Sequence, residues 1–150
     1  MADMLPANTF SPELTARIEA IAQEGYDDWN CNSSAEQKAV GFAWDEKFMS
    51  DQEFGAAEMA KSAEMWGASD ANADGLLDEA ECKVFSQKQR EYAASTGNYA
   101  QEKDGYVSKL YAICNDVNPA TPAVAMADYL GVMGVYMQKC QALKQVSAAH

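Results

Sequence analysis

Acidic side chains are densely grouped in residues 70–81, whose sequence is DANADGLLDEAE. Five of these twelve residues are Asp or Glu, and no Lys or Arg lies among them. Carboxylates in so short a stretch repel one another, and a bound cation would relieve that repulsion. Hard divalent cations such as Ca²⁺ and Mg²⁺ are bound in proteins by carboxylate, amide and carbonyl oxygens. The residue types therefore predict a cation site within this stretch.

The spacing of the oxygen-bearing residues narrows this prediction. It satisfies the pattern D-x-[DN]-x-[DN]-G-x5-E at every defined position, and in this it resembles the calcium loop of the EF-hand family. The resemblance implies that Gly75 permits a sharp turn, that Leu77 pairs in a short strand with a partner loop, and that Glu81 binds through both carboxylate oxygens. The implied Ca²⁺ ligands are Asp70, Asn72, Asp74, the backbone carbonyl of Leu76, Asp78 and Glu81.

Apolar residues at helical spacing predict helices on both sides of this loop and along the rest of the chain. The first helix is expected to begin at Pro12, with Ser11 as its cap, and to end near Gly25. A capping pattern, SDQE at 50–53, is expected to open the helix that enters the loop. No segment shows a convincing alternation of apolar and polar residues, as a strand would. The sequence therefore predicts an all-α fold of about six helices.

We expect these helices to form an EF-hand-like array of three helix–loop–helix units within one domain, 1–150. The unit at 51–95 contains the intact loop, and the units at 12–49 and 104–146 contain degenerate loops. Because EF-hand loops usually pair, the resemblance also implies a short two-strand ladder between paired loops.

The two degenerate loops, at 28–39 and 116–128, lack the glycine of the turn. Some oxygen-bearing side chains remain at suitable positions: Asp28, Asn30 and Asn32 in one loop, and Asp116, Asn118 and Asp128 in the other. We expect neither loop to bind an ion, which leaves one Ca²⁺ per chain. In the second loop, Val124 is placed to pair with Leu77 in the ladder.

Composition limits the classes of partner. The chain has 150 residues, of which 48% are hydrophobic, and its net charge is −12. That charge disfavours nucleic acids and anionic membranes, and it favours cations and basic partners. No apolar run approaches about 18 residues, so no membrane span is expected. The first residues lack the pattern of a signal peptide, and the four cysteines form no CxxC pair, so we expect a cytoplasmic protein with reduced thiols.

Catalysis is not expected. The only histidine is His150, so no Ser–His or Cys–His pair and no zinc cluster is available, and no phosphate-binding glycine loop is present. The leading hypothesis is a calcium sensor or modulator that presents an apolar helical surface to a protein partner, such as a basic or amphipathic helix. Two alternatives remain open: a structural subunit of a larger assembly stabilised by calcium, and a passive calcium buffer.

Overall fold

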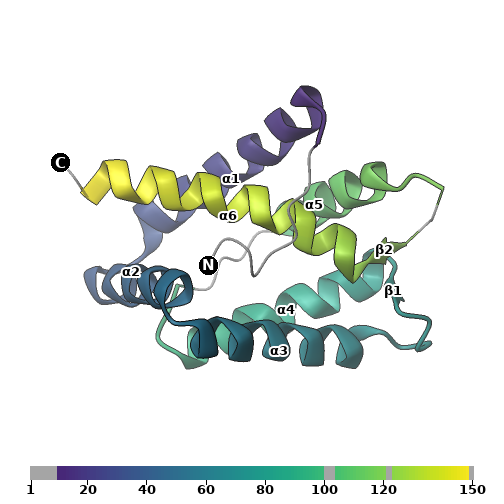
Figure 1. Ribbon diagram of the computed structural model, residues 1–150, viewed down its shortest axis with the longest axis horizontal. Helices are drawn as coiled ribbons and strands as arrows, with labels where there is room; N and C mark the ends of the chain where they lie inside the picture. Colours follow the sequence, from purple (N-terminus) through teal and green to yellow (C-terminus); the bar gives the residue numbers. More distant parts are fainter. Residues whose placement is uncertain (1–9, 100–103, 121–122, 149–150) are drawn as a thin grey trace.

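The computed structural model describes residues 10–99, 104–120 and 123–148, and Figure 1 shows their arrangement. The described residues form helices and one short ladder, as the sequence predicts. In chain order the elements are α1 (Pro12–Asn32), α2 (Ala35–Ser50), α3 (Gln52–Ser69), β1 (Leu76–Leu77), α4 (Glu79–Ser95), α5 (Asp104–Val117), β2 (Val124–Ala125) and α6 (Met126–Ala148).

Side-chain caps set the beginnings of the first three helices. The Ser11 hydroxyl accepts a hydrogen bond from the Leu14 N–H at 3.2 Å, which confirms the predicted cap of α1. At the start of α3, the segment SDQE opens the helix as predicted, but the expectation that Ser50 is its capping residue is wrong. Ser50 is the last residue of α2, and the Asp51 carboxylate accepts the hydrogen bond from the Phe54 N–H at 3.0 Å.

Helix α1 does not end near Gly25, and this prediction is also wrong. The helix continues to Asn32 because its buried face continues through Ala22, Gly25 and Asp28. A glycine inside a helix costs only about 1 kcal/mol, which packing of such a face offsets. The expected loop at 28–39 is therefore replaced by the end of α1, a short turn and the start of α2.

Asp28 consequently has a structural role within α1. Its carboxylate accepts hydrogen bonds from the Asn32 amide at 2.8 Å and from the Tyr99 hydroxyl at 3.1 Å. These contacts tie the end of α1 to the segment after α4. The candidate donors of the first degenerate loop, Asp28, Asn30 and Asn32, lie on a helix and are not arranged as a cation loop.

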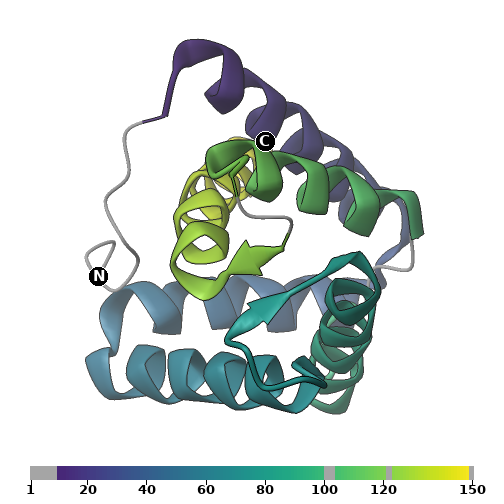
Figure 2. The ribbon, with the colours of Figure 1, turned by 90° about the vertical axis from the view of Figure 1, so that its right-hand side faces the viewer.

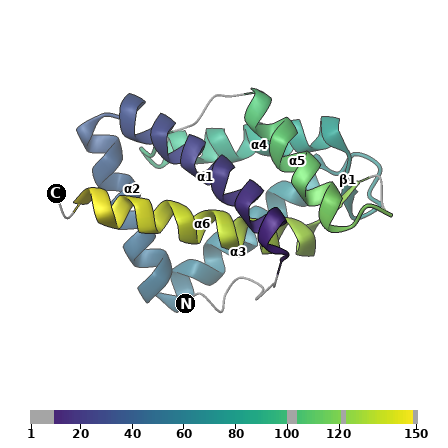
Figure 3. The same ribbon diagram turned by 90° about the horizontal axis from the view of Figure 1, so that it is seen from above.

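The helices form two layers that meet at the ladder. Helix α1 packs against α6 and α5, and α3 packs against α4 and α2 (Figures 1 and 3). Figure 2 shows the two strands side by side, where the α3–α4 connection meets the α5–α6 connection. The strands are antiparallel, with Leu77 opposite Val124 and Leu76 opposite Ala125. The predicted ladder and its predicted partner are thus confirmed.

The hydrophobic core includes the ladder. The largest fully buried side chains come from the two strands and from α1, α5 and α6: Ile18, Leu77, Ile113, Val124 and Val132. Beside them, Trp66 packs against both Phe85 and Tyr129, with ring centroids 5.1 and 5.5 Å away. Among the described residues, no helix has the length and apolar character needed to cross a membrane.

Candidate functional site

The backbone of the acidic loop is tightly curled between α3 and α4. Helix α3 ends at Ser69, and Asp70 follows as its C-terminal cap. Two loop residues then adopt the left-handed conformation, Ala73 at φ 55° and Gly75 at φ 82°. Glycine enters this region without the steric cost that a β-carbon brings, which is why the sequence pattern has glycine at the sharp turn.

The first half of the loop is held by its own side chains. The Asp70 carboxylate accepts hydrogen bonds from the Gly75 N–H at 2.7 Å and from the Asp74 N–H at 3.3 Å. Asn72 Oδ1 accepts a further bond from the Asp74 N–H at 3.4 Å, and Asp74 Oδ1 accepts one from the Leu76 N–H at 2.9 Å. The side chains at the first, third and fifth loop positions therefore all turn toward the inside of the curl.

The second half of the loop is closed by Glu81. Asp78 and Glu81 form a capping box at the start of α4, in which each side chain accepts a hydrogen bond from the other residue's N–H. The other Glu81 oxygen accepts a hydrogen bond from the Ala71 N–H at 2.7 Å. The last predicted ligand thus reaches back across the loop to its second residue, as a closing ligand must.

The ladder joins this loop to the core. Leu77 is 0% exposed and its partner Val124 is 2% exposed. Trp66, one turn before the loop, directs its indole N–H toward the Gly75 carbonyl at 3.5 Å. The loop is therefore anchored by an aromatic side chain at its entrance and by a leucine at its eighth position.

The donor chemistry of the loop fits a hard cation, but its carboxylates are not gathered around one point. Among the described side chains, no three Asp, Glu, His or Cys residues are grouped closely enough to hold a metal ion. The hydrogen bonds above explain the difference, since the carboxylates of Asp70, Asp74, Asp78 and Glu81 each accept a hydrogen bond from a backbone N–H. The backbone is curled as the pattern requires, whereas the carboxylates are directed to separate N–H groups of the loop.

The degenerate loop at 116–128 contributes the strand β2, and its two aspartates lie on the helices on either side of it. Asp116 forms an ion pair with Arg17 of α1 at 2.7 Å. Asp128 lies in the first turn of α6. Residues 121–122 of this loop lie outside the described residues. The Asp116 ion pair therefore connects α5 to α1.

Cys82, beside the loop, has a poorly reactive thiol, as its acidic neighbours predict. Burial, and to a smaller extent the charges of Asp78, Glu81 and Glu79, raise its pKa to about 12. All four cysteines are free. The Cys82 Sγ faces the Leu77 carbonyl at 3.9 Å.

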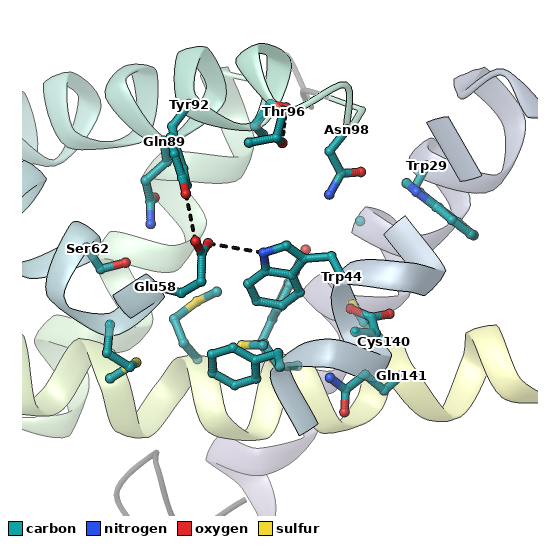
Figure 4. Close-up of a pocket in the computed structure, with 18 of the residues that line it drawn as sticks. Trp29, Trp44, Glu58, Ser62, Gln89, Tyr92, Thr96, Asn98, Cys140 and Gln141 are labelled. Carbon is teal, nitrogen blue, oxygen red and sulfur yellow. Dashed lines mark hydrogen bonds between the residues drawn. The ribbon is translucent and has the colours of Figure 1, made fainter. Parts of the chain in front are cut away.

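A second feature, which sequence reasoning missed, is a cavity of about 340 Å³ between α1, α2, α3, α4 and α6. Figure 4 shows the Glu58 carboxylate inside it. Trp44 Nε1 donates to Glu58 at 3.1 Å, and the Tyr92 hydroxyl donates to it at 2.6 Å. That hydrogen bond is the main cause of a raised Tyr92 pKa. The one sign of this cavity in the sequence is Glu58 itself, which is the single acidic residue in the small and apolar stretch 54–60 of α3.

No family model, curated protein or solved structure matches this chain. Its resemblance to EF-hand proteins therefore depends on the loop residues themselves.

Proposed function

We propose that this chain is a calcium-binding EF-hand protein, a sensor or modulator rather than an enzyme, that binds one Ca²⁺ at residues 70–81. The observation that carries this proposal is the loop itself. Its oxygen donors stand at the required spacing, its glycine is left-handed, and its eighth residue is paired in a ladder. The ligands would be Asp70, Asn72, Asp74, the Leu76 carbonyl, Asp78 and Glu81.

A route from the loop to an apolar surface supports the sensor function. Glu81 lies in the first turn of α4, and Phe85 lies one turn further along. Phe85 contacts Trp66 of α3 and Tyr129 of α6 through ring faces and edges. A shift of the first turn of α4, with Glu81, toward a bound ion would therefore move Phe85, which joins α4 to α3 and α6.

The apolar surface that such a shift would uncover lies beside the ladder. A small cavity of about 100 Å³ is found there between α4, α5 and α6. Phe85, Leu110 and Cys114 are among the residues that line it. Opening it would present a mainly apolar groove beside acidic loop residues, which suits a basic amphipathic helix as partner.

Calorimetry with a matched pair of variants tests the binding site. Glu81→Gln removes one charge and the symmetric two-oxygen grip, so Ca²⁺ affinity should fall at least about a hundredfold, roughly 2.7 kcal/mol. Glu79→Gln makes the same chemical change two residues away, at a position that is not a ligand, and should retain affinity within about threefold. Equal affinity for Ca²⁺ in both folded variants would remove Glu81 from the site and end the assignment.

The sensor function is tested separately by hydrophobic dye binding. Calcium should increase dye fluorescence in the wild-type protein, while magnesium at millimolar concentration should not. Calcium binding without any increase would favour the structural subunit or the buffer instead.

A further inference from the structure

The cavity around Glu58 is a separate feature from the acidic loop, and the proposed calcium function does not use it. Its volume of about 340 Å³ lies within the range of small-molecule sites. Five helices contribute to its walls, so its shape depends on the whole fold. Figure 4 shows Trp44 of α2 and Tyr92 of α4 directed toward Glu58 of α3.

The walls of the cavity combine aromatic rings with methionine side chains. Trp44 and Phe48 are stacked, with centroids 4.8 Å apart and planes 11° from parallel. Methionines from α3 and α6, among them Met59, Met133 and Met137, line the rest of the apolar wall. Aromatic faces attract cations, and methionine side chains adapt to ligands of irregular shape.

Charge is distributed unevenly within the cavity. Lys144 and Asp45 pair with each other at 3.0 Å, so their charges cancel locally. Lys144 also lies over the Trp29 ring, 4.7 Å from its centroid. Among the described residues that line the cavity, Glu58 is the remaining charged one, and its hydrogen-bond donors, Trp44 and Tyr92, are neutral.

Glu58 keeps unused capacity to accept hydrogen bonds. An ionised carboxylate offers about four lone-pair sites, and its hydrogen bonds in this structure come from Trp44 to one oxygen and from Tyr92 to the other. The two donors fix the direction of the carboxylate. An additional N–H donor entering the cavity would thus meet a preorganised acceptor without displacing either bond.

We propose that this cavity binds a small organic cation, an ammonium group on an aromatic body. The ammonium donates to Glu58, and the aromatic body lies against Trp44, Phe48 and the methionines. Anions are rejected by the Glu58 charge and by the net charge of −12. Neutral molecules of the same shape gain the apolar contacts but not the charged hydrogen bond.

Three probes of one shape test this assignment: 1-naphthylmethylammonium, 1-naphthalenemethanol and 1-naphthoate. Binding is measured by calorimetry and by the shift of the Trp44 indole N–H signal in nitrogen-15 NMR spectra, with calcium and again with a chelator. The ammonium should bind at least about tenfold more tightly than the alcohol, and the anion more weakly than both. The Trp44 signal should shift most with the ammonium.

Two variants, each lacking one negative charge, test whether Glu58 causes the preference for the ammonium probe. In Glu58→Gln the affinity for the ammonium should fall by about tenfold, to the level of the alcohol, while the affinity for the alcohol stays at its wild-type value. Glu53→Gln removes the same charge from the exposed first turn of α3, outside the cavity, and should leave both affinities unchanged within about twofold. Circular dichroism shows that each variant is folded.

Several results would overturn the proposal. They are equal binding of the three probes, unchanged ammonium binding in folded Glu58→Gln, or absence of binding at millimolar concentration with and without calcium. The calcium loop is tested independently, because Glu81→Gln alters calcium affinity and leaves every residue of this cavity in place.

Discussion

Replacement of Leu77 by alanine tests how the acidic loop is attached to the core. Leu77 is 0% exposed and lies opposite Val124 in the ladder. Removing a buried leucine side chain costs about 2–5 kcal/mol, and we expect about 3 kcal/mol here. For a domain of this size, that corresponds to a melting temperature lower by about 6–12 °C.

The neighbouring Leu76 provides a matched control. It is half-buried in the same strand, and alanine at either position keeps the backbone carbonyl and the ladder hydrogen bonds. Leu76→Ala should therefore cost about 1 kcal/mol, in proportion to the smaller area it removes from contact. The variants are compared by urea denaturation with far-UV circular dichroism, in a chelator so that bound calcium does not add to the stability.

A variant that carries both Leu77→Ala and Val124→Ala tests whether the two side chains stabilise the protein through direct contact with each other. If Leu77 and Val124 stabilise each other directly, the costs of Leu77→Ala and Val124→Ala should differ from additivity by at least about 0.5 kcal/mol. The reasoning fails if Leu77→Ala destabilises the protein no more than Leu76→Ala. Such a result would mean that the loop is not anchored to the core through its eighth residue.

Two further predictions concern the loop glycine and the thiols. Gly75→Ala should destabilise the protein by about 1–2 kcal/mol, whereas Gly67→Ala within α3 should stabilise it by up to about 1 kcal/mol. Both added methyl groups enter open space, and of these two glycines only Gly75 has a left-handed backbone. The same urea titration measures both variants, and equal changes in stability would contradict this conformational argument. Burial raises the pKa of Cys114 to about 12. A thiol reagent followed by mass spectrometry should therefore label the exposed Cys31 first, and the rate of Cys114 labelling should rise about tenfold per pH unit near neutrality. Equal labelling of the two cysteines in the native protein would refute this prediction.

Local patterns explain what could be predicted from the sequence. The acidic loop and its flanking helices follow from residues close together in the chain, and Val124 is predicted as the partner of Leu77 because it is the β-branched residue at the equivalent place of a flanking loop. The structure bears out the ladder because strand register is fixed once Leu77 must face the core. Each of these predictions needed only spacing and side-chain type.

Tertiary packing explains what was missed. Gly25 resembles a helix end in isolation, but it lies on the buried face of α1, where the packed face extends the helix. The cavity gave no pattern because its key contacts join Glu58 to Trp44 and Tyr92, residues 14 and 34 positions away on other helices. Spacing within one helix cannot reveal an acceptor whose donors come from two others.

The crowding of acids in the loop has a physical explanation that does not require an ion to be present. Asp70, Asp74 and Glu81 each accept hydrogen bonds from backbone N–H groups of the loop. Those N–H dipoles offset the negative charge, and the same bonds impose the curl that the pattern requires. Because a carboxylate has about four lone-pair sites, these oxygens retain capacity for a cation while they hold the backbone. The acids therefore serve as the scaffold of the loop, and in the proposed function they serve also as its ligands.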